Sequence, residues 1–399
     1  MDLACRLSAE TLAKELRPQS RNLQGVYNIP KLVSDPDQVA RLASALTTGH
    51  SDMLSSVKIK LTSFCNLRCK MCHYWKTKTE EALTTDQWFD VLAQLAQMGC
   101  RKLHFSGGEV FLRRDFLDLV EHAASLKLKV NMTTNGTLLT DQRLRRLVAA
   151  RPNSISLSLD GHKASIHDEI RGIPGSYKRT TKTIRKLREL GQRSGRTPRI
   201  RINSVLQQSN FKYAAEMVEA AAQLQVTELH PMPVDEKGPR KNRLSRSQIA
   251  FYNESVAPRV SAARQAAGFS TAPWMIYPFG VSEDEIERSH RGQYSMGFYQ
   301  HRPCLSPWMH LFIGWDGETY LCCMTNRRMD SLGNVGRQTL EDIFNGAPMK
   351  AVRERFLQLN LETSCGRCDM VTPENFSLHK ALESSGQILP SPFVQSVPG

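Results

Sequence analysis

Short apolar runs recur through the middle of the chain, and each is followed by a longer segment with helical periodicity. Residues 154–159 alternate apolar and hydroxyl side chains with a period of two, which is typical of a β-strand. Residues 179–190 and 213–224 repeat apolar positions at helical spacing. Strands that alternate with helices indicate βαβ units and a parallel sheet, and therefore an α/β fold. The other predicted strands are 57–62, 102–105, 128–133, 199–205 and 226–230.

Three cysteines lie on one short loop after the first predicted strand. Cys65, Cys69 and Cys72 have C-x3-C-x2-C spacing. Three thiolates can hold three corners of a cubane [4Fe–4S] cluster and leave the fourth iron without a protein ligand. An open coordination position is a place to bind and activate a ligand, as in catalytic zinc sites. A zinc knuckle or three unrelated thiols are the alternatives, although His73 is poorly placed to be a fourth zinc ligand.

A second motif, Gly107-Gly108-Glu109, follows the next predicted helix and strand. Glycines let the backbone approach a ligand closely, and a carboxylate accepts charge-assisted hydrogen bonds from an ammonium group. Glycine pairs are most often simple turns. The position of this pair, one strand–helix–strand unit after the cysteine loop, makes it informative.

The cysteine loop and the Gly-Gly-Glu motif together resemble those of the radical S-adenosylmethionine (SAM) superfamily. The resemblance implies a partial (βα)6 barrel over residues 57–231, with the active site at the carboxyl ends of its strands. It also implies that Cys65, Cys69 and Cys72 hold a catalytic [4Fe–4S] cluster, which reductively cleaves SAM to a 5′-deoxyadenosyl radical. Asp160 could instead belong to a simple turn and Arg171 could be a surface charge. The SAM-binding residues implied by the resemblance are Gly107, Gly108, Glu109, Ser158, Asp160 and Arg171.

A second group of cysteines lies near the C-terminus. Asp316-Gly317 between two apolar runs predicts a hairpin that brings Cys304 and Cys322 together. With the later C-x2-C pair, this region resembles the auxiliary-cluster domain called SPASM, or twitch in its short form. The resemblance implies one auxiliary [4Fe–4S] cluster in a small α+β domain over residues 304–370, and a zinc ribbon is the alternative. The four ligands would be Cys304, Cys322, Cys365 and Cys368.

Cys323 is left over beside an expected ligand. It could be a packing thiol, or the cluster ligand in place of Cys322. The third hypothesis gives it a catalytic role, as a hydrogen-atom donor to a substrate radical.

The chain has 399 residues, of which 40% are apolar, and this suffices for two or three domains. We expect an N-terminal helical extension over 1–56, a bridging region that contributes to the substrate pocket over 232–303, and a partly disordered tail over 371–399. No run reaches transmembrane length, the first residues lack a signal-peptide pattern, and ten cysteines fall mostly in metal motifs, which together indicate the cytoplasm.

The net charge of +14 is concentrated in residues 178–201 and 237–246. Such a surface suits nucleic acid, phosphorylated substrates or an acidic electron donor of the flavodoxin or ferredoxin type, and a solvated helix face accounts for part of it. The sequence contains no RNA-binding module and no basic stripe interleaved with aromatic residues, so nucleic acid is not an expected partner.

These features predict a radical SAM oxidoreductase that abstracts hydrogen from a substrate C–H bond. The first expectation is dehydrogenation of a polar small molecule of the sugar or aminocyclitol type. The alternative is a maturase or epimerase that acts on a ribosomal peptide or a sugar. A non-catalytic iron–sulfur or zinc-binding scaffold is an alternative of another class.

Overall fold

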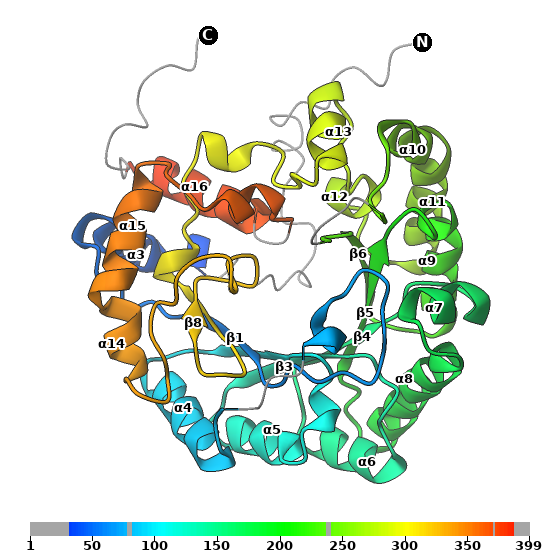
Figure 1. Cartoon of the computed structure of the whole chain (residues 1–399), viewed down its shortest axis with the longest axis horizontal. Helices are drawn as coiled ribbons and strands as arrows, with labels where there is room; N and C mark the ends of the chain where they lie inside the picture. The colour runs from blue at the N-terminus through cyan, green and yellow to red at the C-terminus, as the bar shows by residue number, and fades with distance from the viewer. Residues whose placement is uncertain (1–31, 78–81, 237–240, 370–371, 387–399) are drawn as a thin grey trace.

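The computed structural model describes residues 32–77, 82–236, 241–369 and 372–386. One curved sheet, with helices around its outer side, dominates the molecule (Figure 1). Its strand order is β6-β5-β4-β3-β2-β1-β7-β8, and the first six strands run parallel. The predicted partial barrel is therefore confirmed. Its strands are β1 Ser56–Lys60, β2 Lys102–Ser106, β3 Lys129–Thr134, β4 Ser154–Ser158, β5 Arg199–Leu206 and β6 Glu228–Pro233.

The helices of the barrel cover the outer face of the sheet (Figure 1). Their starts follow local capping chemistry: Thr84 and Gln87 form a reciprocal capping box, and Thr140 accepts a hydrogen bond from the N–H of Arg143. A short helix, α7, is inserted between β4 and α8, and its C-terminal end meets the cysteine loop. These helices are α4 Thr85–Gln97, α5 Phe116–Ser125, α6 Asp141–Ala149, α7 Ala164–Arg171, α8 Ser176–Arg193 and α9 Ala214–Gln223.

The two faces of the strands differ in chemistry. Outward-facing residues such as Ile59, Phe105 and Ile202 are apolar and fully buried under the helices. Their neighbours on the inner face include Lys58 and Arg201, which line a cavity in the lumen. Parallel barrels are usually filled by branched apolar side chains. This lumen is polar, and the alternation that produces it was recognised in the sequence only for residues 154–159.

The predicted C-terminal hairpin is present as β7 His310–Ile313 and β8 Thr319–Tyr320, which pair antiparallel. β7 also pairs in parallel with β1, from Ser56 opposite His310 to Ile59 opposite Ile313. The C-terminal unit therefore extends the barrel sheet instead of forming a sheet of its own. This pairing satisfies backbone groups of β1 that an open sheet edge would leave exposed.

The helices of the bridging region pack against α9 and the edge strand β6. In the bridging region, Arg264 is fully buried and pairs with Glu228 of the edge strand β6 at 2.7 Å. Two helices of this region are joined by a π-helical segment at Tyr252–Val256. The helices here are α10 Arg246–Phe251, α11 Ala257–Ala267, α12 Pro273–Ile276 and α13 Glu283–His290.

The N-terminal extension packs on the C-terminal unit. Helix α3 spans Pro36–Thr48 of this extension, and its residues 1–31 lie outside the described residues. Trp308 donates its indole N–H to the carbonyl of Ala45 at 3.0 Å. The C-terminal unit also contains α14 Leu340–Asn345 and α15 Ala347–Leu357, at the left of Figure 1. Within the described residues, no helix has the length and apolar character needed to cross a membrane.

The tail expected to be partly disordered begins with an ordered helix. Residues Thr372–Ser384 form a helix, α16, whose Leu378 and Leu382 are fully buried. Its apolar positions recur at i and i+4, the spacing of one helical face, and this signal was missed in the sequence.

Candidate functional site

The cysteine loop is held by the last turn of α7. The N–H of Arg68 donates to the carbonyl of Arg171 at 3.1 Å, and the N–H of Lys70 donates to that of Ile170 at 2.9 Å. Gly172 ends the helix at φ 73°, and a Cβ there would lie 2.4 Å from the carbonyl oxygen of Arg68. A glycine is therefore required both by the left-handed backbone and by the close approach of the loop.

Arg171 and Asp160 lie together beside this loop. Arg171 Nε is 2.7 Å from Asp160 Oδ2, and its Nη1 donates to Cys69 Sγ at 3.7 Å. The other Asp160 oxygen accepts from the N–H of Val205 at 2.8 Å. Both side chains are buried, so Arg171 is not a surface charge and Asp160 does more than form a turn. The pair ties the end of β4 to the cysteine loop.

The two glycines of the Gly-Gly-Glu motif face the chain itself. A Cβ on Gly107 would lie 2.7 Å from the carbonyl oxygen of Thr62, and one on Gly108 would lie 2.0 Å from that of Phe64. Hydrogen bonds of 2.8 Å (Gly108 N–H to Thr62 C=O) and 2.7 Å (Glu109 N–H to Phe64 C=O) join the two segments. The small residues thus let the strand end meet the segment that leads into the cysteine loop.

Glu109 is buried and bound on both oxygens. Oε1 accepts from Thr134 Oγ1 at 2.6 Å and from the N–H of Phe111 at 3.2 Å, and Oε2 accepts from the N–H of Asn135 at 2.7 Å. Burial raises the pKa of Glu109, and these hydrogen bonds oppose the shift. An ionised carboxylate has about four acceptor positions, so Glu109 can still accept a hydrogen bond from a ligand. Ser158 is half-buried at the end of β4, opposite Asn203 of β5.

The second cysteine group combines segments that are far apart in the sequence. Cys304 precedes β7, and Cys322 follows β8. Burial raises the pKa of Cys365, and negative charge on Cys304 and on Cys322 adds to this shift, so the three thiols lie close enough to interact electrostatically. Cys368 lines the same cavity as Cys322. Asn375 of α16 donates its amide N–H to Cys304 Sγ at 3.7 Å and accepts from the N–H of Leu305 at 2.6 Å. Sequence reasoning missed Asn375 because it did not predict α16.

Burial determines the charge state of the cysteines in both groups. It raises the pKa of Cys65 and of Cys322 to about 12, so their thiolate forms need a bound cationic partner. The iron of a [4Fe–4S] cluster, which cysteine thiolates hold, is such a partner.

Cys322 and Cys323 both line the lumen cavity. Burial raises the pKa of Cys322, and negative charge on Cys323 and then on Cys304 raises it further. Burial also raises the pKa of Tyr74, and charge on Cys72 and on Cys323 adds to that shift. The choice of Cys322 as the cluster ligand therefore stays a prediction.

Tyr74 connects the cysteine loop to the turn after β8. Its hydroxyl accepts from Asn326 Nδ2 at 3.1 Å, and its ring meets that of Trp315 edge-on at 5.9 Å. Lys60 Nζ lies 3.3 Å from the ring centroid. Burial raises the pKa of Tyr74 to about 12, so it stays a neutral phenol. The only sequence signal was an aromatic cluster directly after Cys72.

Family models match both parts of this arrangement. The radical SAM superfamily model covers residues 59–203, and an iron–sulfur cluster-binding domain, SPASM, covers residues 304–369. The chain is a radical SAM superfamily member with a SPASM domain. The predicted cofactors, [4Fe–4S] clusters and SAM, are those of these two domains and are confirmed.

Several characterised proteins are similar to this radical SAM protein. The PqqA peptide cyclase of Rhodopseudomonas palustris is 31% identical over 213 residues, 53% of this chain and 55% of the relative. That of Granulibacter bethesdensis is 29% identical over 304 residues, 72% of this chain and 73% of the relative. The AdoMet-dependent heme synthase of Methanosarcina barkeri is 34% identical over 173 residues, 43% of this chain and 48% of the relative. Most of these alignments span about half the length of the relatives.

A solved structure has the same fold. Streptococcus suis SuiB bound to S-adenosylmethionine superposes with a TM-score of 0.61 and 16% sequence identity, covering 84% of this chain and 76% of SuiB.

Proposed function

We propose that the protein is a radical SAM oxidoreductase that modifies a peptide at an unactivated C–H bond. The observation that carries this proposal is the match to a PqqA peptide cyclase along 72% of the chain, which extends well beyond the radical SAM model. Two heme synthase matches cover 43% and 52% of the chain. The relatives therefore favour the peptide alternative over the dehydrogenation of a sugar or aminocyclitol.

In this proposal, Cys65, Cys69 and Cys72 hold the catalytic cluster. Arg171 donates to Cys69 Sγ, and hydrogen bonds to cluster sulfurs tune the reduction potential. When reduced by one electron, cluster-bound SAM supplies a carbon radical that removes a hydrogen atom from the substrate. The chain itself binds and orients SAM and the substrate, and it excludes water from the site.

The SAM-contacting residues are proposed at the carboxyl ends of the strands. Glu109 retains an acceptor position for the ammonium group, and Arg171 offers a guanidinium to the carboxylate. Because Asp160 already pairs with Arg171, it orients that guanidinium. Gly107 and Gly108 act by letting the cysteine loop close on the strand end. Ser158 lies at the same edge.

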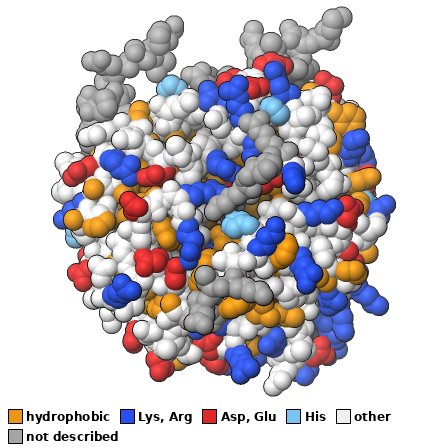
Figure 2. Space-filling view, viewed as in Figure 1, with side chains coloured by type: hydrophobic (Ala, Val, Ile, Leu, Met, Phe, Trp, Pro, Cys, Tyr) orange, Lys and Arg blue, Asp and Glu red, His pale blue; other side chains and the backbone are white. Residues whose placement is uncertain are grey.

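The auxiliary cluster is proposed on Cys304, Cys322, Cys365 and Cys368. Cys323 then remains free beside the lumen, where it is the candidate hydrogen-atom donor. The electron donor is proposed to be an acidic flavodoxin or ferredoxin, because Lys and Arg side chains gather at the lower right of the face in Figure 2, where α8 lies in Figure 1.

The test uses anaerobically reconstituted protein with dithionite, SAM and the short peptides encoded beside its gene. We expect 5′-deoxyadenosine formation to rise with one peptide, and that peptide to change mass in step. A sugar or aminocyclitol that is oxidised while every peptide stays unchanged would contradict the proposal.

A further inference from the structure

A cavity of about 200 Å³ lies inside the barrel. It extends from residues at the amino ends of the strands, such as Lys102, to Cys322 and Cys323 at the auxiliary site. Lys58 and Arg201 also line it, from strands on opposite sides of β2, β3 and β4. Four cationic side chains line this one small space, the fourth being Arg199.

Three of these cations have no close counter-ion. Among the residues that the structure describes, no carboxylate lies within 4.0 Å of the charged nitrogens of Lys58, Lys102 or Arg201. The charge of Glu374 raises the pKa of Lys102, and the charge of Lys58 lowers the pKa of Asp369, but in both pairs the charged atoms are more than 4.0 Å apart.

The remaining acidic neighbour is Glu228, which acts on Arg201. Its carboxylate is already engaged, because it pairs with Arg264 at 2.7 Å and accepts from the N–H of Ser270 at 3.0 Å. Glu228 is therefore shared with Arg264 and Ser270 and is not a dedicated counter-ion of Arg201.

The other polar groups of the cavity do not add charge. Burial lowers the pKa of His230 to about 4 and that of His310 to about 3, and it lowers the pKa of His104 well below its usual value. These imidazoles are neutral at pH 7 and can take part in hydrogen bonds. The cavity thus combines fixed cations with neutral polar groups.

We propose that the lumen binds a carboxylate of the substrate through Lys58, Lys102 and Arg201. The proposal rests on the proposed peptide function, in which the carboxylate is an acidic side chain or the free C-terminus of the peptide. A guanidinium and ammonium groups around one cavity suit a carboxylate, which accepts short charge-assisted hydrogen bonds. Because Cys322 and Cys323 line the same cavity, an anchored carboxylate would place neighbouring peptide atoms beside the auxiliary site.

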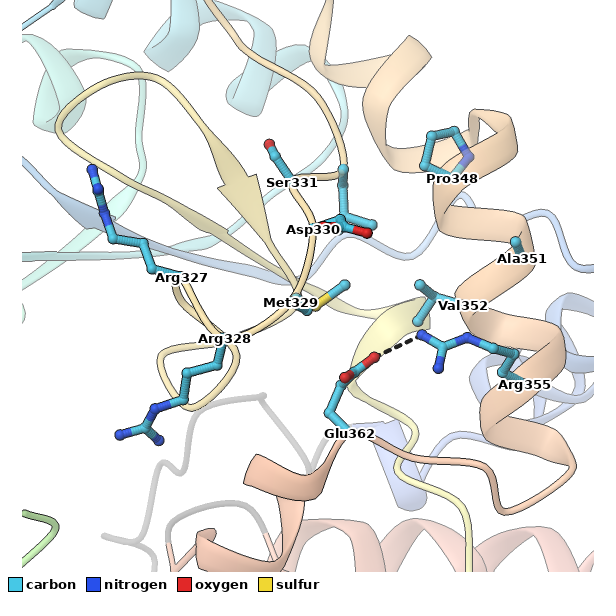
Figure 3. Close-up of a pocket in the computed structure, with 11 residues that line it drawn as sticks. Arg327, Arg328, Met329, Asp330, Ser331, Pro348, Ala351, Val352, Arg355 and Glu362 are labelled. Atoms are coloured by element: carbon cyan, nitrogen blue, oxygen red, sulfur yellow. Dashed lines mark hydrogen bonds and ion pairs between the residues drawn. The ribbon is translucent and has the colours of Figure 1, made fainter. Parts of the chain in front are cut away.

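A second, larger hollow of about 770 Å³ also contains arginines but is built differently. Arg355 pairs with Glu362 at 2.7 Å, as Figure 3 shows, and Arg328 pairs with Asp235 at 3.2 Å. Arg327 pairs with Asp316. Each of these three arginines has a carboxylate within 4.0 Å, although Asp235 also pairs with Arg367, so this hollow gives no reason to select an anion.

Cations held near one another without close partners lower the stability of the fold. Lys102 illustrates this, because burial and the charges of Arg201 and Arg199 lower its pKa to about 8. Groups that bind a ligand commonly reduce stability in this way. A purely structural lysine would instead have a close acidic partner.

The test compares binding of acetyl-Gly-Glu-Gly-amide and acetyl-Gly-Gln-Gly-amide to the reconstituted protein with SAM, by calorimetry. We expect the Glu peptide to bind roughly ten- to a hundredfold more tightly. Lys102→Met and Arg201→Met should remove this preference. Lys350→Met, on the exposed surface of α15, should keep it.

Thermal unfolding separates binding from folding defects. Lys102→Met should leave the melting temperature unchanged or raise it, since it removes a cation without a close partner. Equal binding of the two peptides by the unaltered protein, or a preference that survives in both lumen variants, would overturn the proposal. So would inorganic phosphate that competes as well as the Glu peptide.

Further results identify which carboxylate binds and show whether the lumen proposal or the peptide function has failed. Tighter binding of acetyl-Gly-Gln-Gly with a free C-terminal acid than of its amide would support the lumen site with the C-terminus as the source. Efficient modification of a peptide that has no carboxylate would overturn the lumen proposal while the peptide function stands. Glutamate-selective binding by a protein that modifies no peptide would support the lumen site and contradict the proposed peptide function.

Discussion

The two cysteine sites of this protein are built in opposite ways. Cys65, Cys69 and Cys72 lie on one short loop, and α7 and the Gly107–Gly108 segment hold that loop from both sides. The auxiliary site collects cysteines from before β7, after β8 and near the C-terminus, and it adds Asn375 from α16. The first site therefore depends on local spacing and the second on tertiary structure. Variants at the two sites should fail in different ways.

The largest effect is expected at the cysteine loop. Cys65→Ala, Cys69→Ala or Cys72→Ala should abolish formation of 5′-deoxyadenosine, because each removes one of only three ligands of the cluster that binds SAM. Cys100→Ala, at a buried cysteine with no role in either site, is the matched control and should retain activity. Normal SAM cleavage by any of the three loop variants would refute the assignment.

The next largest effect is expected at Arg171. Arg171→Met leaves Asp160 as a buried, unpaired charge and should lower the free energy of unfolding by about 3–5 kcal/mol. It should also remove SAM cleavage, whereas Arg171→Lys should keep part of both. Denaturant unfolding and a cleavage assay with dithionite measure the two effects. Arg185→Met, at an exposed position on α8, should change neither.

A smaller effect on stability should show that the first site depends on close backbone packing. Gly108→Ala places a methyl group 2.0 Å from the carbonyl oxygen of Phe64 and should destabilise the protein by about 1–3 kcal/mol. Iron bound at the cysteine loop should fall with it. Gly366→Ala, between Cys365 and Cys368, is the control, because no atom lies within 4 Å of its Cβ. Equal behaviour of the two variants would contradict the packing argument.

Neighbouring cysteines sharpen the comparison at the auxiliary site. With Cys322 as the proposed ligand, Cys322→Ala should lose the auxiliary cluster, and Cys323→Ala should keep its iron and its SAM cleavage. Iron analysis of the two variants measures this difference. The reverse pattern would assign the ligand to Cys323. Solvent deuterium in the product that disappears in Cys323→Ala would establish a hydrogen-atom donor.

Much of the first site could be predicted from the sequence because its cysteine ligands lie within eight residues of one another. The six parallel strands and the C-x3-C-x2-C loop follow from periodicity and spacing. The Arg171–Asp160 pair could not be predicted as a contact, because it depends on how α7 folds back onto the loop. The auxiliary site was only partly predictable: the Asp316-Gly317 turn indicated the hairpin, but nothing local indicated that β7 pairs with β1. Asn375 was missed because its apolar neighbours were not recognised as one helix face.

The central claim is that the chain holds two clusters at independent sites. Iron and sulfide analysis with Mössbauer spectroscopy, on protein reconstituted from cells grown with ample iron, tests it directly. The unaltered protein should hold about eight irons, and the triple variant Cys65→Ala, Cys69→Ala, Cys72→Ala should hold about four as one [4Fe–4S] cluster. Zinc in place of iron in the triple variant, or complete loss of iron from a protein that remains folded, would contradict the account.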